Sequence, residues 1–249
     1  TLIGGLAGDA LVDADSNVAV GYAALSSDTL GSGSVAIGTQ ALTSQNFTSA
    51  VDVYNVAVGH RAGLAVTSGS KNTLIGGLAG DALTTGITNV AVGYQALSSD
   101  TAGKRSVAIG NGALFTQNFT SATDTYNTAV GEAAGLSVTT GVNNTLIGGL
   151  AGDAITTGAS NVAIGKSALS ANTTGSYNSA LSRQALYSNT TASYNTAAGS
   201  SALFNTTTGG YNTAFGADSL LSNTTASYNV AVGYQTLKAN TTGTANTAI

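Results

Sequence analysis

The segment NVAVGYAALSS at residues 17–27 returns almost unchanged as NVAVGYQALSS at 89–99, and related segments recur along the whole chain. Each begins with Asn or Ser and continues through an apolar stretch to Gly and Ala. The segments start at Asn17, Ser34, Asn55, Asn72, Asn89, Ser106, Asn127, Asn144, Asn161, Asn178, Asn195, Asn212, Asn229 and Asn246. The residue numbers of successive starts differ by 17, except for two steps of 21 that begin at Ser34 and Ser106. Such a fixed period is the signature of a repeat protein.

The length and pattern of the unit favour a β-solenoid. Seventeen residues are too few for the helix pairs of helical solenoids, which need about 33 or more. Each unit instead alternates β-branched residues with Ala, then has Gly, Ala-Leu and a polar turn such as SANTTGSY at 170–177. We predict an all-β parallel β-roll or β-solenoid. Each coil would have a strand at N-V-A-V, a bend at Gly, a second short strand at A-L-x-x and a polar return turn.

A longer period is superimposed on the coils. The stretch TLIGGLAGDA begins at residues 1, 73 and 145, which gives 72-residue super-repeats at 1–72 and 73–144 and a partial one from 145. Plain 17-residue coils run from 161 onward. With strands about 4.8 Å apart, roughly fifteen coils would form a single rod over 1–249, on the order of 70 Å long. The four extra residues of each 21-residue coil are expected to bulge from one turn.

Both faces of the predicted strand are apolar. The third position of the repeat is Ala in every coil except two, where it is Leu74 or Leu146, and the fourth position is always apolar. Successive side chains of a strand point to opposite faces, so one face can fill the coil while the other must be covered. We therefore predict an obligate homo-oligomer. The sequence leaves open which face is internal.

These repeats carry a family resemblance. NVAVGYQAL at 89–97, SVAIGNGAL at 106–114 and NVAIGKSAL at 161–169 resemble the repeats in the heads of trimeric autotransporter adhesins. YNTAVG at 126–131 and YSNTTASYNTA at 187–197 are similar to repeats of phage tail fibres and fibre-like bacterial adhesins. The resemblance implies a homotrimeric left-handed β-roll that serves as the shaft or head of a surface adhesin or tail-type fibre. It would be extracellular, on a cell surface or on a virion, and would attach to host or prey surfaces through glycans or an envelope receptor.

Composition argues against several other functions. Only 7% of the residues are charged, the net charge is −4, and the seven Lys and Arg are scattered, so nucleic-acid binding is not expected. No run of about 18 apolar residues occurs, so this segment is not expected to insert into a membrane. The chain has no Cys, a lone His60 and a single Glu, Glu132. We therefore predict no enzyme activity, no metal site and no cofactor.

The Gly-rich stretch is similar to the calcium-binding nonapeptide of a different β-roll. Here it recurs only once in each super-repeat, which would place Asp9, Asp81 and Asp153 roughly 19 Å apart. They cannot share one ion at that spacing, and solvated Asp side chains in tight turns are expected.

Aromatic side chains are the candidate surface contacts. Phe47 and Phe119 lie in the two long coils and would be receptor contacts if exposed; alternatively each folds back over its own loop. Tyr residues immediately precede the Asn of four consecutive coils, and we expect them to stack as a ladder. They are Tyr177, Tyr194, Tyr211 and Tyr228. The ladder would serve either as a carbohydrate-stacking surface or as packing between coils.

An alternative function rests on a Thr column at the thirteenth position of each plain coil. A regular Thr array could bind ice or another crystalline surface, although Asn and Thr side chains in such turns usually close them by local hydrogen bonds. The candidate column is Thr84, Thr101, Thr139, Thr156, Thr173, Thr190, Thr207, Thr224 and Thr241. Sequons, which we expect to mark surface turns, begin at Asn46, Asn118, Asn172, Asn189, Asn223 and Asn240.

Overall fold

The computed structural model describes residues 1–249 and contains strands but no helix. It confirms an all-β parallel β-solenoid of about 15 turns, built mostly from 17-residue coils. The long-sheet strands are β1 (Leu2–Ile3), β2 (Val18–Val20), β4 (Val35–Ile37), β6 (Val56–Val58), β7 (Thr73–Ile75), β8 (Val90–Val92), β10 (Val107–Ile109), β12 (Thr128–Val130), β13 (Thr145–Ile147), β14 (Val162–Ile164), β15 (Ser179–Leu181), β16 (Thr196–Ala198), β17 (Thr213–Phe215), β18 (Val230–Val232) and β19 (Thr247–Ala248). Short strands in the long coils are β3 (Gly31–Ser32), β5 (Val51–Asp52), β9 (Gly103–Lys104) and β11 (Thr123–Asp124).

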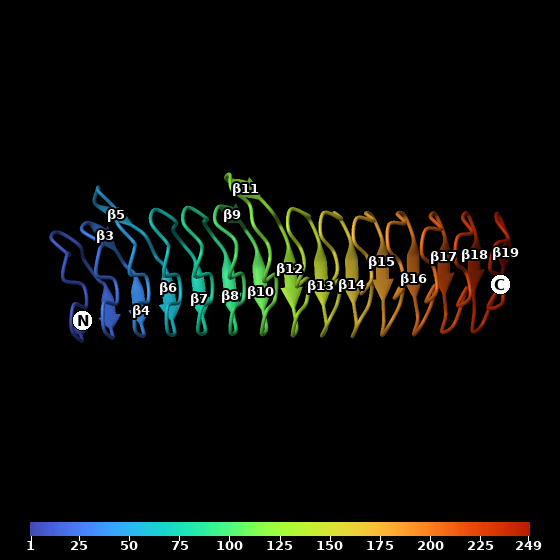
Figure 1. The fold of residues 1–249 in the computed structure, drawn as a ribbon, viewed down its shortest axis with the longest axis horizontal. Helices are drawn as coiled ribbons and strands as arrows, with labels where there is room; N and C mark the ends of the chain where they lie inside the picture. The colour runs from blue at the N-terminus through green and yellow to red at the C-terminus, as the bar shows by residue number, and fades with distance from the viewer. The chain divides into compact units, whose positions relative to one another are not determined.

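The chain forms two compact units, Thr1–Tyr126 and Asn127–Ile249. In the first unit the sheet order is β1-β2-β4-β6-β7-β8-β10, and in the second it runs from β12 to β19 in sequence order. Neighbouring strands within each unit are parallel and in register, so equivalent residues of successive coils form columns. Within the first unit, the long coils project beyond the other turns at β5 and β11 (Figure 1).

A buried Asn opens most coils and ties each one to the next. The Nδ2 of Asn89 donates to the carbonyl of Gly103 at 2.9 Å, which closes its own coil. Its Oδ1 accepts the backbone N–H of Ser106 in the next coil, also at 2.9 Å. Buried amides need such partners, and the repeated spacing supplies them from one coil to the next. The Asn column therefore holds successive coils in register.

The Ala column faces the interior, which answers the question that the sequence leaves open. Ala91 and Ala108 are fully buried, while the residues that flank them in β8 and β10 point outward. Ala fits there in most coils because the strand packs against the turn on the other side of a narrow coil, as Leu74 packs against Gly80. The β-branched column is therefore the outer apolar face.

The prediction of a second strand at A-L-x-x is wrong. In this segment Gln95 and Leu97 each have a φ of 55°, in the left-handed region, which is incompatible with an extended strand. The backbone still bonds between coils, with Leu97 N donating to Ala113 O at 3.0 Å. A series of stacked tight turns replaces the strand and directs the Leu side chain into the core.

In one coil of each 72-residue super-repeat, the large core side chain comes from the strand instead of from the turn. In most coils Ala occupies the strand and a buried Leu occupies the turn, as in the pair Ala91 and Leu97. In one coil of each super-repeat the strand instead holds a Leu and the turn holds a Gly, as at Leu74 and Gly80. A Cβ at Gly80 would lie 2.8 Å from Cδ2 of Leu74, so the two large side chains exclude each other.

A second buried column runs through the return turns of the second unit. Asn172, Asn189 and Asn223 are fully buried, although each lies in a turn that has an exposed Thr two residues later. Each donates Nδ2 to the carbonyl three residues later, as Asn189 does to Ala192 at 3.0 Å. The backbone, rather than solvent, is the partner of these amides.

Thr206 interrupts this column and leaves Oδ1 of Asn189 buried without a partner. Replacing Thr206 with Asn would supply an Nδ2 donor at the missing position. We expect Thr206→Asn to raise the free energy of unfolding by about 1 kcal/mol, the usual value of one buried hydrogen bond. Denaturant titration followed by circular dichroism measures the change. Thr208→Asn, at an exposed position of the same turn, is the control and should change little; a destabilised Thr206→Asn would contradict the assignment.

In the second unit the residue directly after each strand from β12 to β18 is Gly, except at Ser182. Its φ is 120°, in a region that favours Gly, and Gly165 and Gly199 take the same position in the adjacent coils. We expect Ser182→Gly to raise the free energy of unfolding by about 1–2 kcal/mol. Ser188→Gly, in the following turn, should be neutral or destabilising in the same denaturant titration. Equal effects of the two changes would refute the strain at Ser182.

Candidate functional site

The outer face of the long sheet is the most unusual surface of the molecule. In the first unit, Ile37, Ile75 and Ile109 each keep about 37–38% of their surface exposed. The second column of the same face holds Val35, partly exposed, and its equivalents. A parallel sheet normally has both faces covered. Here one face packs inside the coils, and the other presents rows of β-branched side chains.

The second unit carries the same apolar face with larger variation. Ile147, Ile164 and Leu181 are 37–40% exposed, and Phe215 is 47% exposed. Ala198 stands directly beside Phe215 on the neighbouring strand, so a small and a large side chain alternate there. Large exposed apolar surfaces of this kind are characteristic of interaction sites.

A buried carboxylate anchors the loop of each long coil. Asp28 is fully buried and accepts the backbone N–H of Phe47 at 3.0 Å and Nε2 of Gln45 at 2.6 Å. Oε1 of Gln45 then accepts Nδ2 of Asn55, the first residue of the following coil, at 2.8 Å. A buried charge is tolerated only where donors surround it, and here they come from the loop that it fixes.

The second long coil repeats this arrangement. Asp100 accepts the N–H of Phe119 at 3.0 Å, the N–H of Gly103 at 3.1 Å and Nε2 of Gln117 at 2.6 Å. Neither network is among the sequence predictions. The sequence does contain a signal for these networks. Asp28 and Asp100 occupy equivalent positions of the two super-repeats, and a Gln lies 17 residues after each of them.

Burial raises the pKa of Asp100, although the hydrogen bonds from Phe119, Gln117 and Gly103 act in the opposite direction. Because this pKa is higher in the folded state than in the unfolded chain, the stabilising contribution is complete at acid pH and is lost as pH rises through the raised pKa. We expect the wild type to gain stability relative to Asp100→Asn as pH falls from 7 toward about 4. Unfolding free energies at several pH values test this; a relative loss on acidification would contradict it.

The two candidate Phe residues turn back toward the coil. Phe119 is buried and only 7% exposed, and Phe47 is partly buried. Their backbone N–H groups donate to the anchoring carboxylates of Asp28 and Asp100. Phe119 therefore follows the fold-back alternative. The exposed loop tips, at residues 48–50 and 120–122, instead carry short and uncharged side chains.

The two loops differ in their charged contacts. In the first, the hydroxyl of Tyr54 donates to Asp52 at 3.0 Å, and this hydrogen bond, together with the negative charge of Asp52, raises the pKa of Tyr54. In the second, Arg105 forms an ion pair with Asp124 and donates to the hydroxyl of Tyr126 at 3.1 Å. The loops thus share a scaffold and present different surfaces.

The Thr side chains of the thirteenth position form hydrogen bonds between successive coils. The hydroxyl of Thr173 donates to the carbonyl of Thr190 at 3.0 Å, and Thr156 and Thr207 make the same contact with the following coil. These side chains are half-buried. The exposed Thr side chains belong to the next position, as at Thr174.

The predicted tyrosine ladder is present in the second unit. The rings of Tyr177, Tyr194, Tyr211 and Tyr228 stack with centroids 5.0, 5.0 and 5.1 Å apart and interplanar angles of 6–8°. Each ring is about half-exposed.

The remaining polar candidates are separate. His60 is exposed, and Asp81 and Asp153 each accept a hydrogen bond from a Ser hydroxyl of the next coil. No group of three or more His, Cys, Asp or Glu side chains lies together in a metal-binding arrangement. No helix is long and apolar enough to span a membrane.

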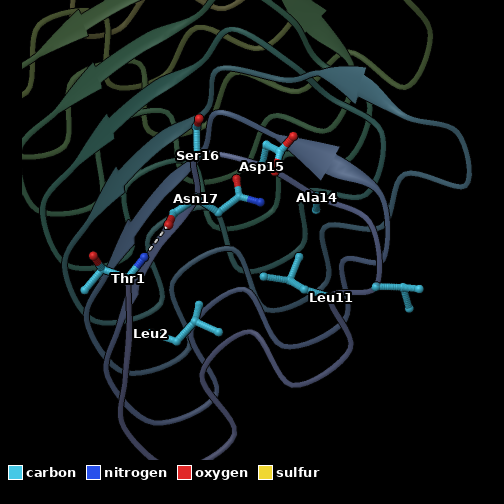
Figure 2. Close-up of a pocket in the computed structure, with 8 residues that line it drawn as sticks. Thr1, Leu2, Leu11, Ala14, Asp15, Ser16 and Asn17 are labelled. Atoms are coloured by element: carbon cyan, nitrogen blue, oxygen red, sulfur yellow. Dashed lines mark hydrogen bonds between the residues drawn. The ribbon is translucent and has the colours of Figure 1, made fainter.

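A depression of about 280 Å³ lies on the first coil (Figure 2). Leu2 and Leu11 line it, and the equivalent residues of the next super-repeat, Leu74 and Leu83, are fully buried. The amino group of Thr1 donates to the carbonyl of Asn17 at 2.8 Å along its rim. The depression is therefore lined by residues whose equivalents in the next super-repeat form the core of a coil.

Comparisons with protein-family models, curated protein sequences and solved structures gave no match to this chain.

Proposed function

We propose that this chain is the shaft or head segment of a homotrimeric fibre, either a surface adhesin or a tail-type fibre, that mediates attachment to a host or prey surface. The proposal places the protein outside the cell, on a cell surface or on a virion. The number of chains and the attachment role come from the sequence resemblance.

The observation that carries the proposal is the outer apolar face of the long sheet. Side chains such as Ile109 and Ile164 keep more than a third of their surface exposed, and apolar side chains take the equivalent position in the other coils. In a monomer this face would be open to water over the length of each unit and would promote association. A closed trimer would cover three copies of the face around one axis.

The rest of the surface suits attachment through many weak contacts. It is polar, with few charges, and the long-coil tips project from the first unit (Figure 1). Three copies of each tip in one fibre would raise the effective affinity for a repeated glycan or receptor. Glycan-array screening of the labelled protein tests this part; absence of binding to every glycan and to whole cells would contradict attachment.

Cysteine cross-linking tests the interface, because the chain has no native Cys. Ile164→Cys lies on the outer apolar face, and Thr174→Cys lies on an exposed turn of the same coil. Around a threefold axis two of three thiols at position 164 can pair, so oxidation should give disulfide-linked dimers plus free chain. Thr174→Cys should stay unlinked at the same concentration. Equal cross-linking of both variants, or none at position 164, would reject this interface.

The geometry does not favour the alternative of ice binding by the thirteenth-position Thr column. Its hydroxyls donate to backbone carbonyls of the next coil and are half-buried, so they are not free to order a water layer. A thermal-hysteresis assay distinguishes the two functions, and clear hysteresis would favour the alternative.

A further inference from the structure

The tyrosine ladder occupies a backbone position that disfavours bulky side chains. The four Tyr residues have φ values of 59–63°, in the left-handed region where Gly and Asn are preferred. Other coils place Gly33 or Asn143 at the same position. Tyr is thus used four times in succession at a conformational disadvantage. Lys71 and Arg105 also take this conformation in other coils, so the distinctive feature of the ladder is the use of Tyr in four consecutive coils.

The stacked arrangement determines what the ladder presents to solvent. Neighbouring rings lie 5.0–5.1 Å apart and nearly parallel, so the faces of Tyr194 and Tyr211 are turned toward other rings. The four residues are about half-exposed, so solvent reaches the rings along the side of the stack, and no hydrogen bond within the chain involves the four hydroxyls. A sugar ring that stacks on an aromatic face has access only at the two ends of the ladder. This geometry disfavours carbohydrate stacking along its length.

The segments that contain the rings are similar in composition and carry no charge. The segments that flank the rings are SYNSAL at 176–181, SYNTAA at 193–198, GYNTAF at 210–215 and SYNVAV at 227–232, and none contains a charged residue. Ser and Thr beside the rings are short, as at Ser179 and Thr196. From Tyr177 to Tyr228 the column consists of three ring-to-ring steps of 5.0, 5.0 and 5.1 Å, so the row of rings is elongated along the stack.

We infer that this ladder is a binding site for flat, elongated and uncharged aromatic molecules that lie along the column of rings. The edge of an aromatic ring is electropositive and its face is electronegative, so edge-to-face contact is favourable. A ligand lying flat on the ladder would receive four ring edges on its π face. Its length would match the column, and the free hydroxyls would bond to polar groups at its rim. The inference requires that the ladder stays exposed to solvent in the proposed fibre.

A fluorescence titration with curcumin, a flat and uncharged polyphenol, tests this site on the intact protein. The dye should bind the wild type with an increase in emission. Tyr211→Leu leaves only the pair Tyr177 and Tyr194 stacked, and should raise the Kd at least tenfold. Tyr211→Phe keeps the stack and should stay within about twofold of the wild type.

Tyr234→Leu is the matched control, because Tyr234 is exposed in the same unit but belongs to no stack. It should leave the Kd unchanged, and circular dichroism should show native structure for each variant. Failure of the wild type to bind, or equal effects of Tyr211→Leu and Tyr234→Leu, would overturn the inference. Loss of binding in Tyr211→Phe would also overturn it, because the stacked edges would then not be the contact.

Discussion

Replacing Gly93 with Ala is expected to lower the free energy of unfolding by at least about 3 kcal/mol, because two costs combine at this position. Gly93 has a φ of 135°, which L-residues rarely adopt. A Cβ there would also lie 2.5 Å from the carbonyl oxygen of Gly110 in the next coil. Since the contact is with backbone, no side chain can move aside. Thermal or denaturant unfolding followed by circular dichroism measures the loss.

Gly77→Ala provides the matched control in the same unit. Gly77 has no positive φ, and the nearest atom to an added Cβ is Cδ2 of Tyr94, at an ordinary contact distance of 3.5 Å. We expect its effect to stay within about 0.5 kcal/mol. Similar losses in the two variants would mean that the close approach of successive coils does not set the need for Gly.

Replacing Ile164 with Asp is expected to dissociate the proposed oligomer at micromolar concentration. Ile164 is 40% exposed in the single chain and lies on the outer apolar face, so the carboxylate would be buried without a partner in the assembly. Light scattering should therefore report the mass of one chain for the variant. A heterogeneous population of larger particles would also show that the closed assembly is lost, since the freed apolar face is prone to aggregate.

Thr174→Asp, on an exposed turn of the same coil, is the control for Ile164→Asp. It should keep the mass of the wild type. If Ile164→Asp also keeps that mass while remaining folded, the outer face at this coil does not form the interface.

The sequence predicts the repeat architecture well because equivalent residues recur at a fixed spacing along the chain. The strands begin within one residue of the predicted Asn positions, and the long coils bulge where four residues are added. Periodicity fixes which residues become neighbours in successive coils. It therefore also predicts the tyrosine ladder, which the structure confirms.

What the sequence does not predict is decided by local conformation and packing rather than by periodicity. Alternation shows that Ala91 and Val92 face opposite ways, but both are apolar, so only packing shows that Ala is internal. The turn at Gln95 and Leu97 adopts left-handed conformations that composition does not signal. Asn172 belongs to a turn rich in polar residues, yet it is buried because its amide serves the backbone carbonyl of Gly175.

Sedimentation equilibrium of the wild-type chain tests the central claim most directly. The apolar outer face and the resemblance together predict a single species of three times 24.2 kDa, stable on dilution through the micromolar range. A soluble, well-folded monomer of 24.2 kDa would contradict the proposal, because the outer face of Ile109, Ile164 and their equivalents would then be open to water.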